Sequence, residues 1–207
     1  MLDTEIEKPT LLLVDDEPVN LRVLKQLLGN DYQLVFAKNG EEALTLAENR
    51  LPNLILLDVM MPGLTGFEVC RQLKQKKQTR AIPIIFVTAL GQGEDEEKGF
   101  ALGALDYITK PISPPLVRAR VKTHITLAHQ MRVTELKVKE RTADLQRSQQ
   151  SAITMLAAAG HYNDNDTGHH IWRMAAYSRA LAFAAGWAED KAELMELAAP
   201  MHDTGKI

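Results

Sequence analysis

Five short apolar runs recur along the first part of the chain. They cover residues 11–14, 33–36, 54–57, 83–87 and 104–108, and each is too short for a typical helix. Continuous apolar runs of this length are typical of strands that are buried on both faces of a parallel sheet. The stretches between them carry apolar residues at helical spacing. Strand and helix therefore alternate, which predicts an α/β fold with helices on both faces of a parallel sheet.

The helices between these strands have recognisable ends and inward faces. The first begins at Pro18, a residue that suits the first turn, and ends at Gly29. Its expected inward residues are Val19, Val23, Leu24, Leu27 and Leu28. The second helix covers 40–47, with Ala43, Leu44 and Ala47 inward, and the third carries Phe67, Val69, Cys70 and Leu73. Residues 91–102 form a weaker, glycine-containing acidic helix.

Polar residues stand at the carboxyl ends of four of the five strands. They are Asp15 and Asp16, Asp58, Thr88, and Lys110. Because the carboxyl ends of parallel strands meet at the same edge of a sheet, these side chains should converge. Taken singly, each could be a helix cap, a strand-end threonine or a surface lysine, but a coincidence at all four ends favours a functional site.

The chemistry of this predicted cluster is that of phosphoryl transfer. Three neighbouring carboxylates repel one another unless a cation lies among them, and oxygen ligands suit Mg²⁺. Lys110 offers a positive charge for phosphate oxygens, and Thr88 offers a hydroxyl donor. Asp58 can act as the nucleophile that forms an aspartyl phosphate while the cation and Lys110 neutralise the developing charge.

Composition narrows the class of protein. The 207 residues are 45% hydrophobic and 25% charged, which is ordinary for a globular chain, and the net charge of -3 gives no general reason to expect nucleic-acid binding. The single cysteine, Cys70, excludes an internal disulfide and falls on a helix pattern, so a buried and inert thiol is expected. Residues 1–8 form a polar tail without an apolar signal region. A cytoplasmic protein without membrane insertion is expected.

Residues 9–128 resemble the receiver domain of two-component response regulators. The resemblance rests on LLLVDDEP, LILLDVMMPGLTG, the VTA at 87–89 and the pair Lys110-Pro111. It implies a flavodoxin-like, doubly wound sheet of five parallel strands in the order 2-1-3-4-5. It also implies a histidine kinase or phosphotransfer protein as partner.

The resemblance further assigns roles to individual residues. Asp58 is the phosphoacceptor, and Asp16, Asp58 and the backbone carbonyl of Met60 bind Mg²⁺, with Asp15 shaping the metal site. Lys110 contacts the phosphate, and a cis bond precedes Pro111. Thr88 and Tyr107 form a switch pair that reports phosphorylation to the face built by the last helices and strand.

A long helix is predicted from Ser113 to about residue 160, with residues 129–150 as a linker. Apolar or half-polar residues recur every seven positions: Val117, His124, Met131, Val138, Leu145 and Ala152. The companion positions Arg120, Leu127, Thr134, Arg141 and Ser148 are mostly polar, so the pattern indicates only a weak coiled coil. The helix could transmit the receiver's state, hold a homodimer together, or do both.

Residues 151–207 predict an all-α segment with metal-ligand chemistry. Asp166 and His170 stand four residues apart and share a helix face, and His202-Asp203 adds two more ligand types suited to a transition metal. Pro200 implies a kink just before this pair. A purely structural reading remains open, in which Asp166 only caps a helix and His202 only packs.

The stretches DNDTGHHIWR and LAAPMHDTGKI resemble the opening of an HD-GYP domain, a family of metal-dependent cyclic di-GMP phosphodiesterases. The resemblance implies that Asp166, His170, His202 and Asp203 are the first ligands of a site for Fe or Mn. The family's later histidines and its Gly-Tyr-Pro stretch are not found before Ile207. This 207-residue chain is therefore expected not to hydrolyse cyclic di-GMP and to expose Leu181, Leu194 and Leu197.

Three functional classes follow from these patterns. The first is a response regulator that controls an HD-GYP phosphodiesterase output, incomplete in this chain. The second is a stand-alone phosphoacceptor that acts by protein contact, with the helical tail as an oligomerisation element. The third, a DNA-binding regulator, is disfavoured because no basic recognition helix follows the receiver.

Overall fold

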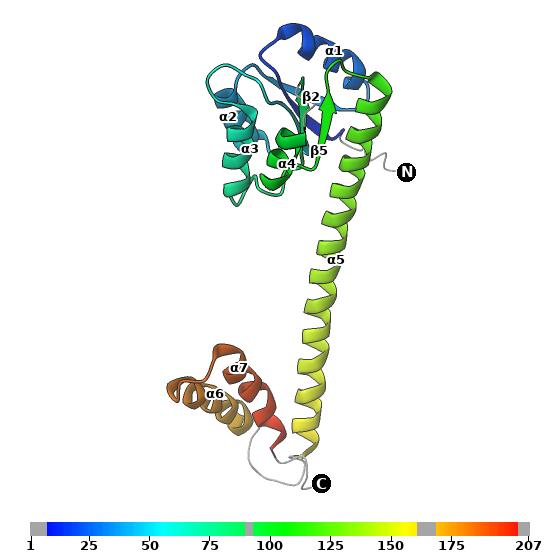
Figure 1. Cartoon of the computed structure of the whole chain (residues 1–207). Helices are drawn as coiled ribbons and strands as arrows, with labels where there is room; N and C mark the ends of the chain where they lie inside the picture. The colour runs from blue at the N-terminus through cyan, green and yellow to red at the C-terminus, as the bar shows by residue number, and fades with distance from the viewer. Residues whose placement is uncertain (1–7, 90–92, 161–168, 203–207) are drawn as a thin grey trace, which may run out of the picture. The chain divides into compact units, whose positions relative to one another are not determined.

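The computed structural model describes residues 8–89, 93–160 and 169–202 (Figure 1). In chain order the elements are β1 Thr10–Val14, α1 Pro18–Leu28, β2 Gln33–Ala37, α2 Gly40–Arg50, β3 Leu54–Asp58, α3 Gly66–Gln75, β4 Ile84–Thr88, α4 Gly93–Ala101, β5 Asp106–Thr109, α5 Pro114–Gly160, α6 His169–Ala184, α7 Glu189–Ala198 and the 3-10 turn η1 Ala199–Met201. The chain divides into two compact units, Met1–Val133 and Thr134–Ile207, and the division falls within α5.

The first unit contains one parallel sheet in the order β2-β1-β3-β4-β5, which confirms the predicted topology. Every residue of β3 and of β4 is buried, which explains why the sequences of these central strands are apolar almost throughout. The fifth strand begins at Asp106, two residues later than predicted, and the Leu105 side chain before it is 51% exposed. All five strands point the same way, so their carboxyl ends share one edge.

Helices cover both faces of the sheet, as predicted. On one face, α1 and the first turns of α5 pack on the strands, with Leu24, Leu28, Val117 and Val121 buried. On the other face lie α2, α3 and α4, and the buried residues of α2 and α3 include Ala43, Ala47, Val69, Cys70 and Leu73. Three residues predicted to point inward are only partly buried: Leu44 and Phe67 on this face, and Leu27 of α1 on the other.

The predicted inward face of α1 is wrong at two positions. Val19 and Val23 are 59% and 38% exposed, whereas Leu21, which was not predicted, is buried. The buried stripe consists of Leu21, Leu24 and Leu28, spaced by three and four residues. Val19 and Val23 form a separate row on the same helix, so their apolar character does not place them in the core.

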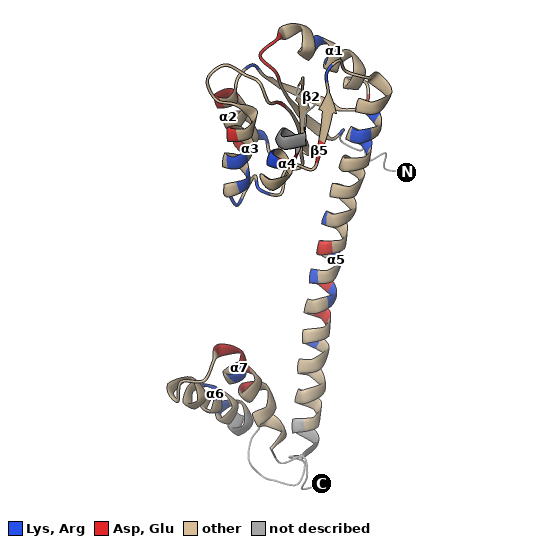
Figure 2. Ribbon diagram, in the orientation of Figure 1, with Lys and Arg blue, Asp and Glu red and all other residues tan. Residues whose placement is uncertain are grey.

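Helix α5 runs without interruption from Pro114 to Gly160, 47 residues, which confirms the predicted long helix. Only its first turns enter the core of the first unit. The seven-residue row becomes exposed farther along, and Met131, Val138 and Leu145 are 66%, 58% and 60% exposed. Lys and Arg alternate with Asp and Glu along the middle of α5, so this surface carries charges of both signs (Figure 2).

The second unit contains α6 and α7, which pack through buried alanines, Ala175, Ala182 and Ala192. Leu181 and Leu194 are 71% and 64% exposed, as expected from the sequence, whereas Leu197 is partly buried. Helix α7 ends at Ala198 and the 3-10 turn that holds Pro200 follows, which is the predicted kink. None of the helices in the described ranges is long and apolar enough to span a bilayer.

Candidate functional site

Four strand ends bring their polar side chains to one edge of the sheet. Asp15 follows β1, Asp58 ends β3, Thr88 ends β4 and Lys110 follows β5. Asp15, Asp58 and Thr88 are only 1%, 3% and 1% exposed, although each carries a polar group. Asp16 is partly buried, and one carboxylate oxygen from each of Asp15, Asp16 and Asp58 lies within 4.8 Å of the others. The structure thus places the predicted carboxylates together.

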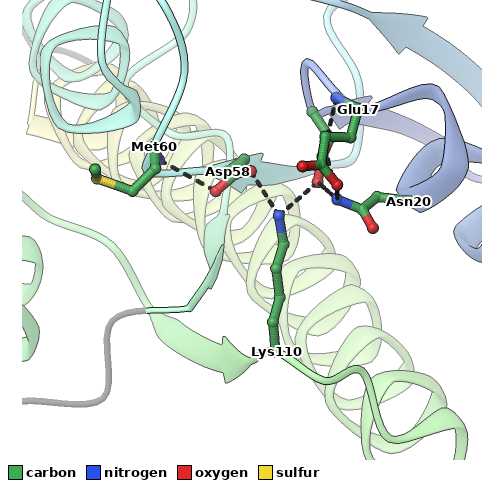
Figure 3. A network of polar contacts seen from close by, with 6 residues as sticks. Glu17, Asn20, Asp58, Met60 and Lys110 are labelled. Atoms are coloured by element: carbon green, nitrogen blue, oxygen red, sulfur yellow. Dashed lines mark hydrogen bonds and ion pairs between the residues drawn. The ribbon is translucent and has the colours of Figure 1, made fainter.

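Lys110 joins two of these carboxylates (Figure 3). Its Nζ donates to Asp58 Oδ2 at 2.6 Å and to Asp15 Oδ2 at 2.9 Å. Its backbone N–H donates to the carbonyl of Thr88 at 2.8 Å, so the neighbouring strand fixes the start of the lysine side chain. The peptide bond between Lys110 and Pro111 is cis, as the resemblance implied. One ammonium group therefore compensates two buried negative charges.

Two further residues, Glu17 and Asn20, hold Asp15 in place (Figure 3). Asp15 Oδ1 accepts from the backbone N–H of Glu17 at 2.9 Å and from Asn20 Nδ2 at 2.9 Å. Asn20 Nδ2 also lies 3.0 Å from Asp15 Oδ2 and 3.1 Å from Glu17 Oε2. The sequence did not single out Asn20. The feature of the sequence that could have pointed to Asn20 was its position in the first turn of the helix that follows Asp15.

The loop after β3 fixes the direction of the Asp58 side chain. The backbone N–H of Met60 donates to Asp58 Oδ1 at 3.1 Å, and Gly66 N–H donates to the Val59 carbonyl at 3.0 Å. A Cβ at Gly66 would overlap the Asp58 carbonyl oxygen and lie 2.8 Å from Val59 Cα, so only glycine allows α3 to begin this close. Thr65 caps the same helix through a capping box with Glu68.

Burial and charge act against each other on the titratable groups of the site. Burial raises the pKa of Asp58, and the negative charge of Asp15 raises it further. The hydrogen bonds from Lys110 and from the Met60 N–H lower this pKa, but the net shift is upward. Burial lowers the pKa of Lys110, but the hydrogen bonds and charges of Asp58 and Asp15 outweigh this and raise it overall. Lys110 therefore stays protonated and paired with the Asp58 carboxylate.

The donor set fits a hard divalent cation. Carboxylate oxygens from three aspartates within 4.8 Å of one another are ligands that Mg²⁺ prefers, and Asp16 is the least buried of the three. Among the described residues, these three aspartates are the one group of carboxylate, imidazole or thiol ligands that lie close enough together to share a metal ion. At Met60 the structure shows the amide donating to Asp58, while the predicted carbonyl ligand remains a prediction.

Tyr107 lies in the core beside the site. The register of β4 and β5 pairs Thr88 with Thr109 and Phe86 with Tyr107. Tyr107 is 6% exposed, and its ring packs against Phe86 at 5.3 Å and Phe100 at 5.2 Å between ring centroids. The two predicted switch residues therefore come from adjacent strands, with Tyr107 directed into the core.

The predicted second metal site is only partly within the described residues. Asp166 and Asp203 lie outside them, and His170 belongs to α6 without a described side chain. His202 is exposed, and its Nδ1 lies 3.0 Å from the Ala199 carbonyl oxygen. The assignment of these four residues as ligands stays a prediction.

Comparison with known proteins gives a family and relatives for this arrangement. Residues 11–122 match the model of the response regulator receiver domain. A Vibrio cholerae protein named "Probable cyclic di-GMP phosphodiesterase" is 34% identical in an alignment 218 residues long. The alignment covers 98% of this chain and 49% of that relative. This chain thus spans about half the length of that relative.

Solved structures of similar fold cover the first part of the chain. The Vibrio cholerae chemotaxis protein CheY4 has a TM-score of 0.54 and 28% identity, covering 56% of this chain and 98% of its own. The receiver domain of the Pseudomonas aeruginosa sensor histidine kinase PA1611, solved with a magnesium ion coordinated in the active-site cleft, has a TM-score of 0.54 and 29% identity. It covers 57% of this chain and 98% of its own.

Proposed function

Because this chain belongs to the response regulator receiver domain family, we propose that Asp58 accepts a phosphoryl group in a Mg²⁺-dependent reaction. The donor is a phosphohistidine of a histidine kinase or of a phosphotransfer protein. The observation that carries this proposal is Lys110, whose Nζ donates to Asp58 and Asp15 at the edge where Asp16 also lies. The Lys110 ammonium group lies where negative charge develops during phosphoryl transfer.

In this reaction an Asp58 carboxylate oxygen attacks phosphorus, the bond from phosphorus to the imidazole nitrogen of the donor breaks, and an aspartyl phosphate forms. Asp15, Asp16, Asp58 and the Met60 carbonyl would hold Mg²⁺, which when bound neutralises charge on the transferring group. The magnesium reported for the PA1611 receiver supports this assignment. The positive charge of Lys110 can follow the phosphate oxygens, since its stem is flexible.

The buried Thr88 hydroxyl and the Tyr107 side chain are proposed to report the phosphorylated state. Thr88 lies at the end of β4, next to Asp58 on β3 in the sheet order, and its carbonyl fixes Lys110. If the Thr88 hydroxyl moved toward the new phosphate, the packing of Tyr107 and α4 beyond Thr88 would change. The signal would then pass to the face formed by α4, β5 and α5.

Phosphorylation at Asp58 is tested directly with a small phosphodonor and Mg²⁺. The parent chain should gain one acid-labile phosphate, and Asp58→Asn should gain none, because the nucleophile is removed. Asp31→Asn is the matched control, since Asp31 is exposed on another loop and should leave labelling unchanged. Equal labelling of Asp58→Asn and the parent, by intact mass, would show that Asp58 is not the acceptor.

The output of this receiver is proposed to be a cyclic di-GMP phosphodiesterase, with Asp166, His170, His202 and Asp203 binding Fe or Mn. The support is the relative of that name, whose similarity extends over 98% of this chain, beyond the receiver and through the helical segment. The alternative is a phosphoacceptor that acts by protein contact alone. In that case the helical segment would bind no metal.

Metal binding by the second unit separates these two outputs. The chain incubated with Mn²⁺ and desalted should retain metal, and His202→Ala should reduce the retained amount several-fold, because an exposed imidazole ligand is lost. His129→Ala, which removes an exposed imidazole from α5, is the control and should change nothing. Asp58→Asn should be added to both variants so that the receiver site contributes little. No difference between His202→Ala and His129→Ala would favour the protein-contact alternative.

A further inference from the structure

The ring of Tyr107 is closely packed between β4 and α4. Phe86 and Phe100 flank it, with ring centroids 5.3 Å and 5.2 Å away, and Phe67 continues the cluster 5.2 Å beyond Phe86. Lys98 lies 5.6 Å over the Phe67 ring and adds a cation–π contact from the same helix. We call the position bounded by Phe86, Gly99 and Phe100 the Tyr107 seat.

Gly99 makes this seat possible. A Cβ at Gly99 would overlap the Tyr107 hydroxyl oxygen, come within 2.6 Å of Tyr107 Cζ and lie 3.0 Å from Phe86 Cε2. Gly99 is buried within α4, where glycine is a poor helix former compared with alanine. A glycine at this helical position therefore has a packing reason, which is the room that it leaves for the tyrosine.

The backbone of Tyr107 cannot retreat from such a Cβ, because it is held on the opposite side. Arg120 on α5 donates to the Tyr107 carbonyl and to Asp106 Oδ1. His124 Nε2 lies 3.1 Å from Asp106 Oδ2, and Phe86 pairs with Tyr107 in the sheet. With the strand held by β4 and α5, rotation of the Tyr107 side chain out of the seat is the smallest movement that makes room, because the overlap is with the far end of that side chain.

We propose that Gly99 is the positioning residue of the switch: the absence of its Cβ lets Tyr107 sit between β4 and α4, and a methyl group there turns Tyr107 out toward solvent. This inference rests on the proposed role of Thr88 and Tyr107 in signalling. It adds that α4 senses the side-chain orientation of Tyr107 through direct contact at one glycine. A substituent on Gly99 would therefore fix the outward orientation whatever the state of Asp58.

The test is Gly99→Ala in protein labelled with 3-fluorotyrosine and observed by fluorine NMR, with Tyr107→Phe to assign the resonance. In the parent, the Tyr107 resonance should show little solvent isotope shift between H₂O and D₂O, because the side chain is 6% exposed. In Gly99→Ala this shift should rise to that of the denatured chain. Glu97→Ala, an exposed substitution on the same helix, is the control and should behave as the parent.

Stability measurements distinguish displacement of the tyrosine from a general loss of structure. Gly99→Ala in the Tyr107→Ala background should lower the unfolding equilibrium constant about fivefold, as alanine does in an ordinary helix. In the parent background this gain should be absent. A Tyr107 resonance that stays solvent-shielded in folded Gly99→Ala, or equal effects in both backgrounds, would overturn the inference. Failure of the parent to accept phosphate at Asp58 would instead overturn the proposed function and leave the NMR result interpretable.

Discussion

At the scale of single residues, the site is built from charges that are costly to bury. Asp58 is 3% exposed, and burial raises its pKa despite the hydrogen bond from Lys110. A carboxyl whose pKa is higher in the folded chain holds its proton more tightly there than in the unfolded chain. The free energy of unfolding therefore falls as pH rises through the window between the ordinary and the raised pKa. Ionised Asp58 therefore lowers the stability of the folded chain.

Asp58→Asn should accordingly stabilise the metal-free chain in a pH-dependent way. The gain in the free energy of unfolding over the parent should be largest at neutral pH, where Asp58 is ionised in both states. It should shrink as pH falls through the raised pKa and level off below about pH 3.5, where the carboxyl is protonated in both states. Urea denaturation across this range measures it. A gain that does not vary with pH would contradict the raised pKa of Asp58.

At the scale of elements, the start of α3 determines where Asp58 points. Gly66→Ala should destabilise the chain by about 2 kcal/mol or more, because the new Cβ meets backbone atoms of Asp58 and Val59 that cannot move aside. It should also slow phosphate labelling by at least tenfold, since the loop that carries the Met60 amide must shift.

Thr65→Ala is the matched comparison for this glycine. It removes the capping box of α3 and should cost about 1 kcal/mol, but leaves the contact of Gly66 with Asp58 intact. Labelling of Thr65→Ala should therefore proceed at the parent rate. If both variants lose labelling in proportion to their stability, as measured by denaturation and by intact mass, Gly66 has no specific role in placing Asp58.

At the scale of the whole molecule, the exposed row along α5 predicts a homodimer. Met131, Val138 and Leu145 are all more than half exposed at seven-residue spacing, although the companion positions Thr134, Arg141 and Ser148 are polar. Sedimentation should show a dimer whose population rises with concentration. Val138→Lys with Leu145→Lys should weaken it at least tenfold, because lysines cannot be buried in the seam.

The control places the same charges on another side of α5. Ala143→Lys with Gln150→Lys adds two lysines, also seven residues apart, at exposed positions that face away from the row. This pair should leave the association unchanged. A strict monomer for the parent at high micromolar concentration, phosphorylated or not, would remove the coiled-coil interpretation of α5.

The sequence pattern by itself determined the alternation of strands and helices, the long helix and the members of the acidic site, while the strand order 2-1-3-4-5 came from the resemblance to receiver domains. Four of the five apolar runs lead into Asp15, Asp58, Thr88 and Lys110, and because the strands are parallel, strand direction alone brings these groups to one edge of the sheet. The match of residues 11–122 to the receiver family agrees with this pattern.

Tertiary structure alone decided what depends on three-dimensional neighbours. Apolar character did not show that Val19 and Val23 point to solvent while Leu21 is buried, because the angle at which α1 meets the sheet selects the buried row. Nor did the sequence pattern reveal that Gly99 makes room for Tyr107, and the place of Asn20 in the helix after Asp15 did not by itself show the hydrogen bonds between them. Gly99 lies on α4 and Tyr107 on β5, and Asn20 lies on α1 whereas Asp15 follows β1, so these distances are set only once the sheet and helices have packed.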